Sequence, residues 1–166
     1  MDWAITAIVA LGVSGFMSLL IIIGLLHNPR MALHSFPQAI QNAVRPKTVH
    51  EKRLTAIYSL GTIAALLVTP FAYALMVEET SFSVIWLHVF AIAMVFNIVD
   101  LLLIDWLLLC MITPSWAIIP GTESGHAYSA YKDYRFHFNG FITGIAFCVA
   151  LPTIIIGLVW VKNLVI

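Results

Sequence analysis

The residues Phe82–Ile112 read FSVIWLHVFAIAMVFNIVDLLLIDWLLLCMI. This stretch of 31 residues contains no Lys, Arg or Glu, and its only acidic residues are Asp100 and Asp105. About 20 consecutive apolar residues are enough for an α-helix to cross a bilayer core of ~30 Å. The stretch therefore predicts a membrane-spanning helix. As an α-helix it would be ~46 Å long, so we expect it to tilt or to extend beyond the membrane.

Three further segments have the same character, at residues 3–26, 54–77 and 138–161. The whole chain is 61% hydrophobic and 10% charged, with a mean hydropathy of +0.99, whereas soluble domains are about 45–50% apolar and 25% charged. This composition excludes a water-soluble monomer. It predicts an all-α fold with a single domain over residues 1–166, a bundle of four transmembrane helices connected by long loops at residues 27–53 and 113–137.

The basic residues are distributed unevenly between the two ends of such a bundle. Seven of the eight lie in the two long loops, and Lys162 is the exception; the seven are Arg30, Arg45, Lys47, Lys52, Arg53, Lys132 and Arg135. By the positive-inside rule both loops are predicted to be cytoplasmic, with both termini and the Glu78–Glu79 turn outside. The net charge of zero argues against a nucleic-acid partner, since no basic excess is available.

The two loops carry patterns of their own. In the first, Phe36, Ile40 and Val44 recur every four residues among polar neighbours, which predicts a short amphipathic helix lying on the bilayer surface. The second loop is dense in aromatic residues, as is typical of a membrane interface; they are Tyr128, Tyr131, Tyr134, Phe136 and Phe138.

Small residues and prolines suggest how the helices pack. Gly140 and Gly144 form a GxxxG pair, and Gly61/Ala65 and Ser14/Ser18 have the same spacing. Such pairs allow close approach of helices, within the bundle or between the subunits of a homo-oligomer. The second and fourth spans each contain a proline, which predicts a bend in each helix; these are Pro70 and Pro152. The depths of Cys110 and Cys148 differ by ~12 Å, so we expect two free thiols.

Asp100 and Asp105 are the residues least expected in lipid, where an ionisable side chain costs several kcal/mol and is a functional candidate. On an α-helix, positions five apart point ~140° apart, so we expect the two carboxylates not to share one crevice. By depth, Asp105 could meet Arg53, Arg135 or His27. Asp100 lies deeper, near Asn97, so we expect it to be protonated, hydrated, bound to a cation or hydrogen-bonded within the bundle. The groups it can reach by depth are hydroxyls such as Ser14, Ser18, Thr62 and Thr143.

Histidines and carboxylates gather at the loop side of the predicted bundle. The candidate acid–base residues are Asp105, His27, His137, Glu123 and His126. Imidazole and carboxylate also bind zinc and iron, which allows a divalent metal; the candidate ligands are His27, His34, His126, His137 and Asp105. No HExxH or paired ExxH motif occurs to specify such a site.

These residues leave three hypotheses open. The first is a membrane-embedded enzyme or binding protein for a lipophilic molecule, with Asp105 and His27 or His137 as acid–base or metal-binding groups. The second is an oligomeric channel or proton-coupled transporter that uses Asp100 and Asn97. The third is a structural or accessory membrane subunit. All three have the lipid bilayer as a partner.

Overall fold

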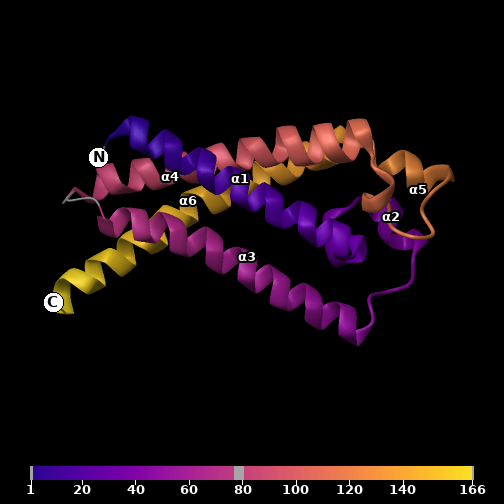
Figure 1. The fold of residues 1–166 in the computed structure, drawn as a ribbon, viewed down its shortest axis with the longest axis horizontal. Coiled ribbons are helices and arrows are strands. Elements are labelled where there is room, and N and C mark those ends of the chain that lie inside the picture. The colour runs from indigo at the N-terminus through magenta and orange to yellow at the C-terminus, as the bar shows by residue number, and fades with distance from the viewer. Residues whose placement is uncertain (1, 77–80, 166) are drawn as a thin grey trace.

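The computed structural model describes residues 2–76 and 81–165, and the backbone alone for 162–165. This part of the chain is helical throughout and contains no strand. Four long helices run side by side, and short helices gather at one end, which we call the loop end (Figure 1). The start of the first long helix and the end of the last lie together at the opposite end, as an even number of spans requires.

All four predicted spans are confirmed as helices long and apolar enough to cross a membrane. They are α1 (Trp3–His27), α3 (Val49–Met76), α4 (Phe82–Val99) continued by η2 (Asp100–Ile112), and α6 (Tyr134–Val165). These features indicate a multi-pass membrane protein with a four-helix bundle. The predicted Glu78–Glu79 turn lies outside the described residues.

Two helices begin earlier than predicted because polar side chains cap their first turns. At the start of α3, the backbone N–H of Glu51 donates to Thr48 Oγ1 at 3.2 Å, and the N–H of Thr48 donates to Glu51 Oε2 at 2.7 Å. This is a capping box. At the start of α6, Asp133 Oδ1 accepts from the N–H of Phe136 at 2.9 Å. Hydropathy alone does not register such caps, so the predicted starts at residues 54 and 138 were too late.

We expect Thr48→Ala to lower the free energy of unfolding by about 1 kcal/mol, because one N-terminal N–H of α3 loses its partner. The matched control is Thr69→Ala, on the same helix, whose exposed hydroxyl donates only to the carbonyl of Ala65. Chemical unfolding of the purified protein in detergent measures both. Equal effects of the two substitutions would contradict the capping role.

The main apolar core lies between α1, α3, α4 and α6, toward the end of the bundle opposite the loop end. Its fully buried members include Met17, Val89, Ile92, Leu151 and Ile155. Helix α3 contributes least: 11% of its most apolar window is buried, against 28–33% for the other spans. Figure 1 shows α3 diverging from α4 and η2 toward the loop end. The bundle is therefore packed at one end and more open at the other.

Short elements cap the loop end: η1 (Pro29–Ser35), α2 (Gln38–Ala43), η3 (Ser115–Ala117) and α5 (Gly125–Ala130). The predicted short amphipathic helix exists as α2, and its apolar side packs against protein. Phe36 is 1% exposed and Ile40 0%, both buried in a second apolar core with Tyr131 and Ile119. The apolar side of α2 faces protein because α5 and the 113–133 segment cover it.

Tyr131 anchors this cap through polar contacts as well. Its hydroxyl accepts from the N–H of Ile119 at 2.8 Å and lies 2.8 Å from Thr122 Oγ1. Thr122 in turn donates to the carbonyl of Ile119 at 2.7 Å. The predicted aromatic belt is thus divided, because Tyr131 belongs to the protein core while Tyr134 and Phe138 are exposed.

The glycine pair on α6 is used within the bundle at one of its two positions. A Cβ at Gly144 would collide with the carboxamide of Asn97 on α4, whereas a Cβ at Gly140 would meet no atom within 4 Å. The carboxamide Nδ2 of Asn97 donates to the carbonyl of Phe141 at 3.1 Å. Gly144 therefore lets α4 and α6 approach closely enough for this interhelical hydrogen bond. Gly61 also has open space at its Cβ position.

Candidate functional site

The third span changes its hydrogen-bonding pattern where its two aspartates begin. Residues Asp100–Ile112 form a π-helix, and the N–H of Thr113 still bonds five residues back to Leu108 at 2.9 Å. In i→i+5 bonding, residues five apart lie nearer to one face than they do in an α-helix. The expectation that Asp100 and Asp105 cannot share a crevice was wrong, because it assumed α-helical geometry. Short π-segments inside α-helices frequently mark functional sites.

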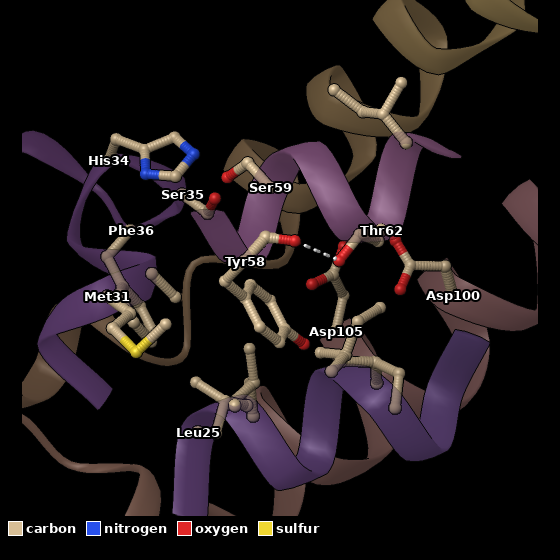
Figure 2. A pocket seen from close by; sticks show the side chains of 16 residues that line it. Leu25, Met31, His34, Ser35, Phe36, Tyr58, Ser59, Thr62, Asp100 and Asp105 are labelled. Carbon is tan, nitrogen blue, oxygen red and sulfur yellow. Dashed lines mark hydrogen bonds between the residues drawn. The ribbon is translucent and has the colours of Figure 1, made fainter. Parts of the chain in front are cut away.

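A cavity of about 360 Å³ lies between α1, η1, α3 and η2 (Figure 2). Its polar lining includes Asp100, Asp105, Tyr58 and Thr62, and Figure 2 shows both carboxylates on the side where Thr62 lies. Most of the rest is apolar: Ile21, Leu25, Met31, Phe36, Ile63, Ile104 and Leu109. Cavities of this size with a few polar groups are typical small-molecule sites.

A second cavity of about 380 Å³ lies between η1, α4, η2 and α6. It shares four lining residues with the first cavity: His34, Ser35, Asp100 and Asp105. The others include His137 and Thr143 from α6 and Asn97 from α4. Because the two aspartates line both spaces, we call the two cavities together the aspartate cleft.

Asp105 is paired with His137 of α6. Its Oδ1 lies 2.9 Å from His137 Nδ1, and the two side chains are 23% and 3% exposed. The early start of α6 places His137 in its first turns, where it can reach across to η2. Of the expected partners of Asp105, His27 and Arg135 are exposed and line neither cavity, nor does Arg53. The arrangement sets the ring orientation of His137 and leaves its other nitrogen available for proton transfer.

That other nitrogen, His137 Nε2, is buried and makes no hydrogen bond with the described residues. The thiol of Cys110 lies close enough to the imidazole to interact with it. Cys110 is five residues beyond Asp105 on the same π-helix. Cys110 is buried and free, as is Cys148, which agrees with the expectation of two free thiols.

Asp100 has no such partner. Its carboxylate makes no hydrogen bond and no ion pair with the described residues. His137, which lines the second cavity with both aspartates, is within ion-pair distance of Asp105 and not of Asp100. Of the hydroxyl groups expected near it, Thr62 and Thr143 line the cleft with it. Ser14 instead donates to the carbonyl of Ala10 at 2.7 Å, and Ser18 lines neither cavity.

The remaining acid–base candidates lie apart from the aspartate cleft. His27 ends α1 and is exposed, and His126 is exposed on α5. Glu123 accepts twice from the N–H of Gly121, at 2.9 and 3.0 Å, and this bonding lowers the pKa of its carboxyl group. Glu123 is therefore ionised and hydrogen-bonded within its own turn, outside the cleft.

The five candidate metal ligands do not converge. Among the described residues no group of three His, Cys, Asp or Glu side chains is arranged to hold a metal ion. Asp105 and His137 meet, and His34 lines the cleft with them, but His27 and His126 lie elsewhere.

Two basic residues of η1 and of the segment that follows α2 already have hydrogen-bonding partners. Lys47 Nζ donates to the carbonyl of Met31 at 2.6 Å and to Thr55 Oγ1 at 3.2 Å. Arg30 Nε donates to Glu51 Oε1 at 2.6 Å. Partial burial, and then the positive charge of Lys47, lower the pKa of His34, so His34 is a neutral imidazole at pH 7.

The structure contains a second polar cluster that the sequence did not predict. At the end opposite the loops, Thr6 Oγ1 lies 2.7 Å from the hydroxyl of Tyr73 and 2.5 Å from His88 Nδ1, and Trp3 stacks on the His88 ring. These residues come from α1, α3 and α4. The only sequence signal was the single histidine near that end of its span. Buried polar contacts of this kind join helices in apolar surroundings.

The cleft is thus a polar pocket within an apolar bundle, with one aspartate paired to a histidine and one unpaired. No protein-family model, curated protein or solved structure matches this chain.

Proposed function

We propose that the aspartate cleft binds a lipophilic molecule in the membrane and that Asp105 and His137 act on it as an acid–base pair, from the cytoplasmic side. One observation carries this proposal: Asp105, whose Oδ1 lies 2.9 Å from His137 Nδ1 in the second cavity, also lines the largely apolar first cavity. A carboxylate that holds one imidazole nitrogen leaves the other to accept or donate a proton.

The apolar part of the cavity supports a lipophilic ligand. Its walls come from α1, η1, α3 and η2, and α3 is the least buried of the spans. A loosely packed helix on the wall of an intramembrane cavity gives lipophilic molecules a route from the bilayer. The ligand would then meet the acid–base pair at the polar part of the cleft.

We expect Asp105→Asn and His137→Gln to lose chemical conversion of a bound lipophilic molecule by at least a hundredfold, since general acid–base catalysis contributes about 10²–10⁴. The protein, purified in nanodiscs of its host lipids, is incubated with a total lipid extract. Mass spectrometry then compares bound species and products between the wild type and each variant.

His126→Gln is the matched control, because His126 is exposed and lines neither cavity. It should behave as the wild type. If Asp105→Asn and His137→Gln form the same products as the wild type, the pair has no chemical role. If the wild type retains no lipophilic molecule, binding in the cleft is also contradicted.

Transport is the weaker alternative, in which Asp100 and Asn97 would line a path. Asn97 lines the second cavity, but its carboxamide is held against Phe141 and Gly144. Between the cleft and the Thr6–Tyr73–His88 cluster lies the main apolar core, with Val89, Ile92 and Ile155 fully buried. A path through the bundle would require this core to separate. Flux in liposomes that is lost on Asp100→Asn would favour transport.

A further inference from the structure

The aspartate cleft is lined by acidic side chains and, among the described residues, by no basic ones other than histidine. It contains two carboxylates, Asp100 and Asp105, and no Lys or Arg from the described residues. His137 can balance only one negative charge and is committed to Asp105. His34, the other imidazole of the lining, is neutral at pH 7 by the pKa argument above. Lys47, whose positive charge acts on His34, is bound to a backbone carbonyl and to Thr55.

Asp100 is therefore a carboxyl group without a positively charged partner among the described residues. A buried carboxylate without a partner is costly, and inside a membrane such a group is paired, hydrated or functional. Hydroxyl groups lie around it, because Thr62 and Thr143 line the two sides of the cleft. A hydroxyl group can donate one hydrogen bond but supplies no positive charge. A carboxyl group in such a position stays ionised only beside a positive charge, and among the described lining residues no Lys or Arg supplies one.

We propose that the lipophilic molecule bound in the aspartate cleft carries a cationic amine head, which sits between Asp100 and Asp105, with its apolar part along α1 and α3. This inference rests on the proposed function, because it names the chemical class of the ligand at the same site. Both carboxylates line both cavities, so a single ammonium group in this space meets both.

The other lining residues suit the same ligand. Aromatic rings flank the cleft, with Phe36 and Tyr58 in the first cavity and Phe136 and Phe141 in the second. Such rings attract cations at their faces. The alkyl part of the ligand meets Ile21, Leu25 and Ile63. A fatty acid or a phosphate head would instead meet two carboxylates with no lysine or arginine beside them, and like charges in a cavity of low polarity repel strongly.

The test uses three probes that share one alkyl chain: dodecylamine, dodecanol and dodecanoic acid. Each is titrated into the full-length protein in nanodiscs of zwitterionic lipid at pH 7, and dissociation constants are measured from displacement of a fluorescent lipophile. We expect dodecylamine to bind at least tenfold more tightly than dodecanol and dodecanoic acid to bind most weakly. Asp100→Asn should remove the preference for the amine and leave dodecanol binding unchanged.

Glu123→Gln is the control, since it removes an acidic group that is exposed and lines neither cavity. Its amine preference should equal that of the wild type. If all three probes bind the wild type equally, or if Asp100→Asn keeps the amine preference, the cationic head is wrong while binding of a lipophilic molecule stands. If no probe displaces the fluorescent lipophile, or the lipophile itself does not bind, the proposed function fails together with this inference.

Discussion

His137→Leu should lower the free energy of unfolding by about 3 kcal/mol, because it leaves the Asp105 carboxylate without its partner in a largely buried position. The contact that is lost is the 2.9 Å ion pair between η2 and α6, in which the imidazole is 3% exposed. Leucine is apolar and of similar size, so the main effect is electrostatic rather than a cavity. Unfolding by a denaturing detergent, followed by circular dichroism, measures the loss.

The double variant Asp105→Leu/His137→Leu separates the pair from its surroundings. Replacing both members of a buried ion pair by apolar residues is often neutral or stabilising, so the double variant should regain most of the lost stability. Conversion of the lipophilic molecule should stay absent in it. A double variant as unstable as His137→Leu alone would show that packing, and not the ion pair, holds His137 in place.

Gly144→Ala should have the second largest effect, a loss of about 1–3 kcal/mol in the free energy of unfolding. Its Cβ would overlap the carboxamide of Asn97, which cannot move aside without breaking its 3.1 Å hydrogen bond to the Phe141 carbonyl. Helices α4 and α6 must then separate or give up this bond. Thermal unfolding in detergent measures the effect.

Gly140→Ala is the matched control, one turn earlier on the same helix, where a Cβ would meet no atom within 4 Å. Because alanine favours the helix over glycine by about 0.5–1 kcal/mol, this variant should be neutral or slightly stabilised. Combining Gly144→Ala with Asn97→Ala should restore part of the lost stability. Equal behaviour of the two alanine variants would contradict close packing at Gly144.

The candidate site could be predicted only in part. Asp100 and Asp105 were recognisable because ionisable residues are rare in apolar segments and costly there, and His137 because it belongs to the histidines and carboxylates gathered at the loop side. Their relation to each other was not recognisable, because it depends on the π-helical pattern of η2, which a run of apolar residues does not encode. The remaining acid–base candidates, His27, His126 and Glu123, have suitable side chains but lie outside the aspartate cleft.

The short helix α2 is a second feature that could be predicted from the sequence only in part. The spacing of Phe36 and Ile40 identified its apolar face correctly, since periodicity reports which residues avoid water. It did not identify what covers that face. Tyr131 and Ile119, about 80 to 95 residues further along the chain, form the cover; a contact between segments so far apart leaves no local pattern.

The sequence by itself determined the four apolar helices and the presence of two carboxylates on the third, because transfer of side chains into lipid is a property of each residue and its neighbours in the chain. The tertiary structure decided which groups meet. The pairing of Asp105 with His137, the shared cleft of Asp100 and Asp105, and the approach of α4 and α6 at Gly144 all depend on helical register and on packing between distant segments.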